Sequence, residues 1–260
     1  MRPQKVIFLT YSLSTGGAER RLVSIANQFA ARGAQVKIVL LDAPLVVFPV
    51  DPKVEVIFLE QEKQDWDLSK NTTEVKFSHC PDSLPASIPE RLRLRFLKCF
   101  AKKRYAIEDM RLFLKQRYAN RIHAFLQDYP EWTVVSFMSF CSVSTTMALS
   151  TLKNHTLFVE CMSPEAEFSG EHPMNNLKRR YYPRAQGGIF QTDEERDFYS
   201  WLQIKKYVIP NPVSGHYPGR HEGVRRKVIV SFARIEKQKN FPLLIDSFAM
   251  LSKEHSDYSL

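Results

Sequence analysis

The chain has 260 residues, 44% of them hydrophobic, and a formal net charge of +9. This length allows a substantial core and at least one complete α/β domain. No apolar run is long enough to span a bilayer, the N-terminal residues lack the apolar core of a secretory signal, and the four cysteines are too scattered for a metal cluster. We therefore expect a cytoplasmic protein with reduced thiols, without a bound metal.

The N-terminal residues have the pattern of a strand, a helix and a second strand. Residues 5–10 predict a buried strand, residues 18–32 a helix and residues 35–41 the next strand. Gly33 is the predicted C-cap of the helix. The inward-facing residues are expected to be Leu22, Ile25, Ala26 and Phe29.

Two adjacent glycines, Gly16 and Gly17, stand in the loop before this helix. Glycine lets a backbone approach a ligand closely, and the N–H groups of the helix N-terminus favour a phosphate. The alternative is a turn that needs glycine for its backbone conformation. Because the loop lacks the G-x-G-x-x-G pattern, it gives no support for a dinucleotide site.

The middle of the chain carries most of the positive charge. Residues 90–121 hold eleven Lys or Arg and only three acidic residues, and apolar residues recur there at helical spacing. A basic amphipathic helix suits an anionic membrane surface, so residues 91–121 are a candidate membrane contact. The alternative is a pair of helices that pack on the sheet with their charged face in water. The chain lacks the motifs of nucleic-acid recognition, and we expect no nucleic-acid partner.

Strand and helix patterns then alternate along the chain. Strands are predicted at residues 132–137, 156–160 and 187–191. Helices are predicted at residues 142–152, 175–184 and 194–202, the last capped by Asp193. Such alternation predicts a doubly wound, Rossmann-like α/β domain with a parallel sheet and helices on both faces, over residues 1–210.

The C-terminal residues resemble the beginning of a second such domain. Prolines 210 and 212 and the polar residues after them predict a linker at residues 211–226. Residues 227–232 predict a strand and residues 241–251 a helix, so Arg234 and Lys239 fall in a turn that suits an anion. A solvated basic loop is the alternative. Residues 227–260 are too few for a complete domain.

Four ordered motifs give the chain a resemblance to a known family. They are Gly16-Gly-Ala-Glu-Arg20, Val159-Glu-Cys-Met-Ser-Pro164 with Ile189-Phe-Gln-Thr192, Val208-Ile-Pro-Asn-Pro-Val213, and the run from Arg234 to Phe241. Together they resemble the family-4 retaining glycosyltransferases, which have a GT-B fold of two Rossmann-like domains. The resemblance is greatest to the branch that builds capsular, exo- or lipopolysaccharide chains.

The resemblance also implies roles for particular residues. Gly16 and Gly17 match the loop that approaches the donor diphosphate, and Arg234 and Lys239 match the cations that hold it from the second domain. Glu160 matches a strand-end residue that contacts acceptor or sugar; the alternative is a surface carboxylate at the end of a strand. No separate catalytic base is expected, because the donor phosphate takes the acceptor proton. At Cys161 and Met162 this chain departs from the Glu-Arg-Asn that is usual in the branch.

The function implied is transfer of a sugar, with retention, from a nucleotide-sugar to a lipid-linked glycan in cell-surface polysaccharide synthesis. Such a protein is either free in the cytoplasm or peripheral on the inner face of the cytoplasmic membrane. Two glutamates of the family's second domain are missing, so we expect the chain to be truncated and inactive alone. The alternative is a non-catalytic remnant or partner subunit that binds membrane or glycan.

Overall fold

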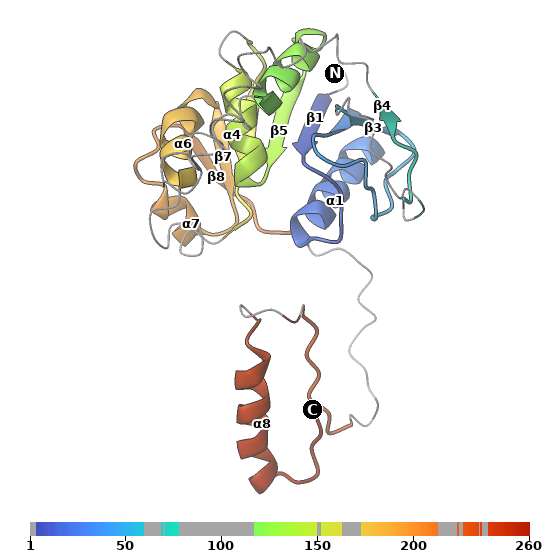
Figure 1. Ribbon diagram of the computed structural model, residues 1–260, viewed down its shortest axis with the longest axis vertical. Helices are drawn as coiled ribbons and strands as arrows, with labels where there is room; N and C mark the ends of the chain where they lie inside the picture. Colours follow the sequence, from blue (N-terminus) through green and yellow to red (C-terminus); the bar gives the residue numbers. More distant parts are fainter. Residues whose placement is uncertain are drawn as a thin grey trace, which may run out of the picture. The chain divides into compact units, whose positions relative to one another are not determined.

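The computed structural model describes residues 4–59, 69, 71–77, 117–149, 152–162, 173–212, 223, 226–233, 235 and 239–260. The chain divides into two compact units, Met1–Ser214 and Gly215–Leu260. The first unit contains the whole of the sheet, and the second contains α8 (Phe241–Glu254) (Figure 1).

The first unit is built on an open parallel sheet. Its strands are β1 (Lys5–Thr10), β2 (Gln35–Leu40), β3 (Val54–Phe58), β4 (Lys76–Phe77), β5 (Thr133–Phe137), β6 (Thr156–Val159), β7 (Gly187–Phe190) and β8 (Lys205–Val208). In the described residues these eight strands lie in the order β4-β3-β2-β1-β5-β6-β7-β8. Every neighbouring pair is parallel. The predicted α/β class and parallel sheet are confirmed, while β3, β4 and β8 are not among the predicted strands.

The strand order defines where a ligand is expected. From β1 the chain first adds β2, β3 and β4 on one side, and then crosses to β5, β6, β7 and β8 on the other. The direction of winding therefore reverses between β1 and β5. In open α/β sheets, ligands bind outside the carboxyl ends of the strands near such a switch point.

The helices connect these strands. They are α1 (Gly17–Ala31), the helical residues 117–127, α4 (Ser139–Ala148), α6 (Pro173–Tyr181) and α7 (Asp193–Phe198). The predicted helix ends at residues 184 and 202 are corrected to Tyr181 for α6 and Phe198 for α7. Two further corrections concern helix starts. First, α4 begins at Ser139, before the predicted start at residue 142. Second, the cap of α7 is Thr192 instead of Asp193, because the Thr192 side chain accepts a hydrogen bond from the Glu195 backbone N–H.

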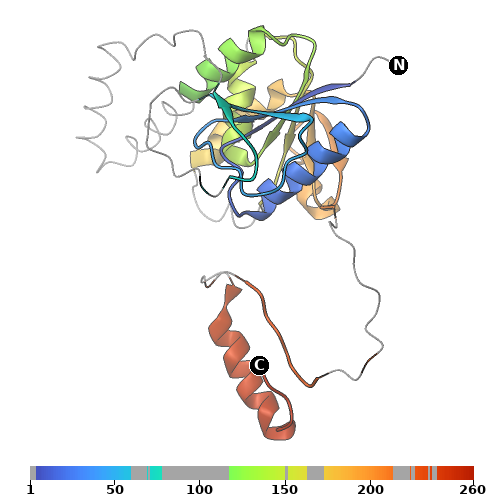
Figure 2. The same ribbon diagram turned by 90° about the vertical axis from the view of Figure 1, so that its right-hand side faces the viewer.

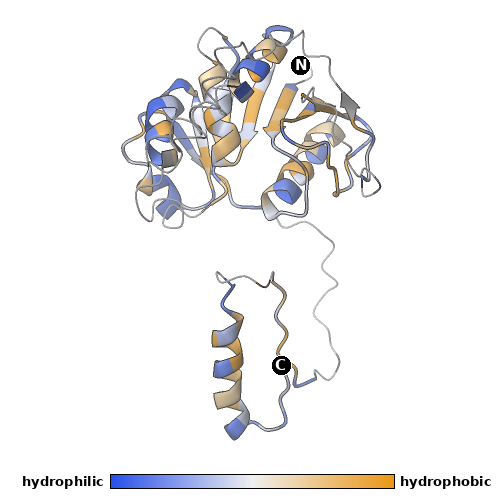
Figure 3. Ribbon diagram, viewed as in Figure 1, coloured by the Kyte–Doolittle hydropathy of each residue, from blue (hydrophilic) through white to orange (hydrophobic). Residues whose placement is uncertain are grey.

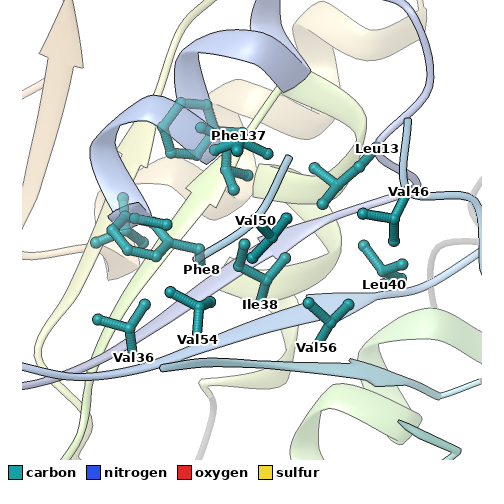
Figure 4. Close-up of a cluster of buried hydrophobic side chains, with 14 of the residues drawn as sticks. Phe8, Leu13, Val36, Ile38, Leu40, Val46, Val50, Val54, Val56 and Phe137 are labelled. Atoms are coloured by element: carbon teal, nitrogen blue, oxygen red, sulfur yellow. The ribbon is translucent and has the colours of Figure 1, made fainter. Parts of the chain in front are cut away.

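Alternating strand residues fill two core layers, one on each face of the sheet. Phe8 and Ile38 belong to the layer that packs against α1, whereas Ile7 and Val39 belong to the layer that packs against residues 117–127 and α4. Figure 2 shows these helices on opposite sides of the sheet, and Figure 3 shows the hydrophobic residues of the central strands. Figure 4 shows the layer next to α1. Both faces are covered, as expected for a doubly wound domain.

Gly33 ends α1 as predicted. Its φ of 85° is in the left-handed region, which glycine adopts without steric cost. Its N–H donates to the Ala30 carbonyl, and the Ala34 N–H donates to the Phe29 carbonyl, both at 3.0 Å. These are the two bonds of a Schellman motif, which satisfies the last carbonyls of a helix. The C-terminal end of α1 is therefore capped where the chain turns toward β2.

The described residues of the second unit contain one helix, α8, and an isolated β-bridge. Val228 forms a parallel bridge with Ser259, and α8 lies between them in the sequence. None of the side chains of α8 is buried. Phe232 and Ile235, which precede α8, are 92% and 93% exposed. Among the described residues, every buried hydrophobic side chain therefore belongs to the first unit.

This distribution predicts the effect of removing the second unit. Deletion of residues 215–260 should leave the melting temperature within about 2 °C of the whole chain, because the deletion removes none of the described core. Differential scanning calorimetry measures this. As a control, deletion of residues 205–260 also removes β8 and should lower the melting temperature markedly. A large loss from the shorter deletion would contradict the prediction.

Candidate functional site

A polar pocket lies at the carboxyl edge of the sheet in the first unit. Its volume is about 340 Å³, at the lower end of the range for small-molecule sites. Its lining comes from the N-terminal half of α1 and from the segments that follow β6, β7 and β8: Gly17, Ala18, Arg20, Arg21, Ser24, Cys161, Gln191, Asn211 and Pro212. The site is therefore where the strand order predicts a ligand.

The N-terminus of α1 supplies one wall of the pocket. Gly16 is the N-cap residue, with extended backbone angles, and Gly17 is the first residue of the helix. Gly17 lines the pocket, whereas Gly16 is not among the residues that line it. A Cβ on Gly17 would meet no heavy atom within 4 Å, so the space in front of it is open to a ligand. The first N–H groups of a helix have no partner within the helix and carry partial positive charge.

Two arginines next to this wall add full positive charge. Arg20 is exposed, whereas Arg21 is only 5% exposed although it also lines the pocket. One Nη of Arg21 donates to the Ile209 carbonyl at 3.0 Å, but its Nε and its other Nη have no hydrogen-bond partner among the described residues. Burial lowers the pKa of Arg21, yet an arginine stays charged at neutral pH. No acidic residue is among those that line the pocket, which therefore favours an anion.

The remaining lining residues are polar but carry no charge. The Asn211 side-chain amide donates to the Gln191 side-chain oxygen, which joins the segments after β7 and β8. Burial raises the pKa of the Cys161 thiol to about 12, so this thiol is protonated at neutral pH and is a poor nucleophile. The pocket can thus bind and orient an anionic ligand through hydrogen bonds, and it offers no thiolate for covalent chemistry.

Behind the pocket, at the end of β6, lies a buried charged cluster that we call the Glu160 cluster: Ser139, Glu160, Lys178, Tyr182 and Tyr199. Glu160 and Lys178 both have fully buried side chains, and the Lys178 ammonium donates to the Glu160 carboxylate at 2.9 Å and to the Tyr199 hydroxyl at 2.8 Å. The Ser139 hydroxyl donates to the same carboxylate oxygen as Lys178, at 3.2 Å. The Tyr182 hydroxyl donates to the other oxygen. This cluster joins β6, α4, α6 and α7.

The predicted site residues do not all lie at the pocket. Gly17 lines the pocket, whereas Gly16, the N-cap residue of α1, does not. Glu160 is buried and bonded on both oxygens, so its predicted contact with acceptor or sugar stays a prediction. Lys239 is exposed in the second unit, and Arg234 lies outside the described residues.

Most of the predicted membrane segment, residues 91–116, also lies outside the described residues. Residues 117–121 are helical, and Ala119 in this stretch is buried in the core layer beneath the sheet. The Tyr118 hydroxyl donates to the Asp42 carboxylate at 3.0 Å. The described end of the segment is therefore part of the helix that packs on the sheet.

Arg21 and the partners of Glu160 are not among the predicted site residues. Leu22 lies on the inward face of α1, and Arg21 directly precedes it. This position next to an inward-facing residue is the one sequence signal that Arg21 is buried. Lys178, Tyr182 and Tyr199 are 18 to 39 positions from Glu160 in the sequence, so nothing local connects them.

No family model matches this chain, and no curated protein matches it. Within the described residues, no helix combines the length and hydrophobicity needed to cross a bilayer. The same residues contain no group of three or more His, Cys, Asp or Glu side chains that could hold a metal ion.

Proposed function

We propose that this chain takes part in retaining glycosyl transfer, and that its first unit binds the diphosphate of a nucleotide-sugar donor. The acceptor in this proposal is a lipid-linked glycan, and the process is cell-surface polysaccharide synthesis. The observation that carries the proposal is the pocket at the N-terminus of α1, where Gly17, Arg20 and Arg21 meet at the carboxyl edge of a parallel sheet. The four sequence motifs support the choice of a nucleotide-sugar among phosphate-bearing ligands.

The positive groups of the pocket suit the leaving group of this reaction. When the bond between the anomeric carbon and the phosphate oxygen breaks, negative charge grows on the departing nucleoside diphosphate. Helix N–H groups and arginines that are already in position stabilise such charge without reorganisation. The acceptor hydroxyl bonds to the same face of the anomeric carbon, and its proton passes to the donor phosphate. The pocket residues therefore bind and orient the donor, and no side chain is assigned as a base.

The uncharged polar residues that line the pocket suit the sugar or ribose hydroxyls of such a donor. Gln191, Asn211 and Ser24 offer both donors and acceptors of hydrogen bonds. The alternative function, a non-catalytic chain that binds membrane or glycan, requires no anion in this pocket. Binding of a nucleoside diphosphate therefore separates the two functions.

NMR titration of the ¹⁵N-labelled chain tests this proposal. UDP, GDP and pyrophosphate should shift the backbone amide resonances of Gly17 and Ala18, whereas uridine and guanosine should leave them in place. We expect weak, millimolar binding, because only Arg20 and Arg21 among the lining residues carry a charge. Unchanged Gly17 and Ala18 resonances with every diphosphate would overturn the proposal and support the non-catalytic alternative.

A substitution at Gly17 makes the test specific to this wall of the pocket. Gly17→Val should weaken pyrophosphate binding about tenfold or more, because the added side chain occupies the approach to the first helix N–H groups. The free energy of unfolding should change by no more than about 0.5 kcal/mol, since the new Cβ meets nothing within 4 Å. The same titration and urea unfolding measure both effects.

The matched control is Ala31→Val, which adds the same methyl groups at the exposed far end of α1. It should leave pyrophosphate binding unchanged. Equal binding by the Gly17→Val variant and the unsubstituted chain would show that the ligand does not approach α1 at Gly17.

A further inference from the structure

Arg21 is an unusual residue for the interior of this domain. It stands in the second turn of α1, and its guanidinium carbon lies 6.0 Å from the centre of the Phe137 ring. Within the part of the chain that the structure describes, this guanidinium makes one hydrogen bond, to the Ile209 carbonyl, and its Nε and second Nη have no partner. A buried charged group that lacks its hydrogen bonds lowers stability, so its presence is better explained by a ligand than by the fold.

Glu195 in α7 is the matching group of opposite charge. It is 7% exposed, and one of its carboxylate oxygens accepts a hydrogen bond from the Gln191 backbone N–H. The other oxygen accepts no hydrogen bond from any residue that the structure describes. Burial raises the pKa of Glu195, the negative charge of Glu160 raises it further, and the positive charges of Arg21 and Lys178 lower it. Arg21 and Glu195 therefore influence each other electrostatically without forming an ion pair.

We propose that Arg21 is the main charge-recognition residue of the pocket, and that Glu195 partly neutralises Arg21 while the pocket is empty. This inference rests on the proposed binding of a diphosphate in the same pocket. A diphosphate oxygen supplies the partner that the free nitrogens of Arg21 lack. Because Arg21 presents several N–H donors in a fixed plane, it can bond the ligand and the Ile209 carbonyl at the same time.

The bond to Ile209 extends this role to the shape of the pocket. Ile209 directly precedes the segment that contributes Asn211 and Pro212 to the lining. Arg21 thus connects the wall formed by α1 with the wall that follows β8. A ligand that binds Arg21 is positioned next to Gln191 and Asn211, whose side chains are hydrogen-bonded to each other.

The test uses pyrophosphate and UDP with the whole 260-residue chain. Arg21→Met should weaken the binding of both about 10- to 100-fold, the range for loss of hydrogen bonds to a charged group. Glu195→Gln should strengthen it about two- to fivefold, because it removes a nearby negative charge but keeps an acceptor for the Gln191 N–H. In the unsubstituted chain, the Nε–Hε resonance of Arg21 should shift on saturation with pyrophosphate.

Arg32→Met is the matched control, since it removes one exposed positive charge from the C-cap position of α1. It should change binding less than twofold. Equal effects of Arg21→Met and Arg32→Met, or an Arg21 Nε–Hε resonance that does not move, would overturn the inference but leave the proposed function intact. Failure of the unsubstituted chain to bind either ligand would overturn both.

Two further measurements complete the test: the first separates the loss of binding from a loss of stability, and the second concerns Glu195. If Arg21→Met lowers the melting temperature, Arg21→Lys keeps the charge without the planar donors and should show intermediate affinity. Unchanged or weaker binding by Glu195→Gln would show that Glu195 does not oppose the ligand.

Discussion

Replacement of Lys178 with methionine should lower the free energy of unfolding by about 3–5 kcal/mol, the range measured when one member of a buried ion pair is removed. Lys178 is fully buried against Glu160, and methionine has a similar length but no charge. The substitution would leave the Glu160 carboxylate buried without its cation. The Ser139 and Tyr182 hydroxyls would remain as its donors. Two neutral hydrogen bonds do not offset the loss of the charge partner.

Urea unfolding monitored by circular dichroism measures this loss. Lys53→Met is the matched control: Lys53 is exposed, and its substitution should change the free energy of unfolding by no more than about 0.5 kcal/mol. The double variant Glu160→Gln with Lys178→Met removes both charges and should recover part of the loss, since paired sites are not additive. A loss below about 1 kcal/mol for Lys178→Met would mean that water or another group neutralises Glu160.

The second large effect is expected at Gly188, where alanine should cost about 1–3 kcal/mol, the usual range for overpacking. A Cβ there would lie 2.6 Å from Cζ and 2.9 Å from Cε2 of Phe158, closer than real Cβ atoms approach other carbons, and 3.0 Å from Cε2 of Phe190, which is a tight contact. The Phe158 ring cannot move away freely, because it stacks on Tyr182 with ring centres 4.0 Å apart. Tyr182 is in turn bonded to Glu160. The methyl group would therefore disturb both the aromatic packing and the Glu160 cluster.

Thermal unfolding compares Gly188→Ala with Gly17→Ala, a substitution of the same kind at a position where the Cβ meets nothing within 4 Å. Gly17→Ala should leave the melting temperature nearly unchanged. Phe158→Leu in the Gly188→Ala background should cost less than the same change in the unsubstituted chain, since the smaller side chain relieves the contact. Equal melting temperatures for the two alanine variants would show that the β7 backbone can shift to accept the methyl group.

Alternation of strands and helices predicted the fold class, because burial on both faces of a parallel sheet produces continuous apolar runs at each strand. It missed β3, although Val54, Val56 and Phe58 alternate in a run that follows Asp51 and Pro52. That run is short and contains Glu55, which is tolerated because Lys37 of the adjacent strand pairs with it. The pairing depends on tertiary contact and is therefore hidden from local patterns.

Gly17 of the glycine loop lines the pocket, but the loop gives no information about the buried charges near it. Helical spacing assigns apolar residues to the inward face and charged residues to the outward face. It therefore predicts that Arg21 is exposed to solvent, whereas the fold buries Arg21 beside Leu22. Glu160 reads as a strand-end carboxylate open to a ligand. Lys178 and Tyr182, which bond Glu160, come from segments later in the sequence, and Tyr199 in turn bonds Lys178. Contacts between residues far apart in the sequence decide both cases, and spacing along the chain does not encode these contacts.

The hydrogen bond between Arg21 and the Ile209 carbonyl spans 188 positions of the sequence. On a ribosome the first glycine loop emerges long before β8, so the two walls of the pocket are synthesised at opposite ends of the domain. Contacts of such high sequence separation form late, after the loop between them has been closed. A ligand that needs both walls would thus bind only chains whose sheet is already complete, and would leave nascent or partly folded chains without it.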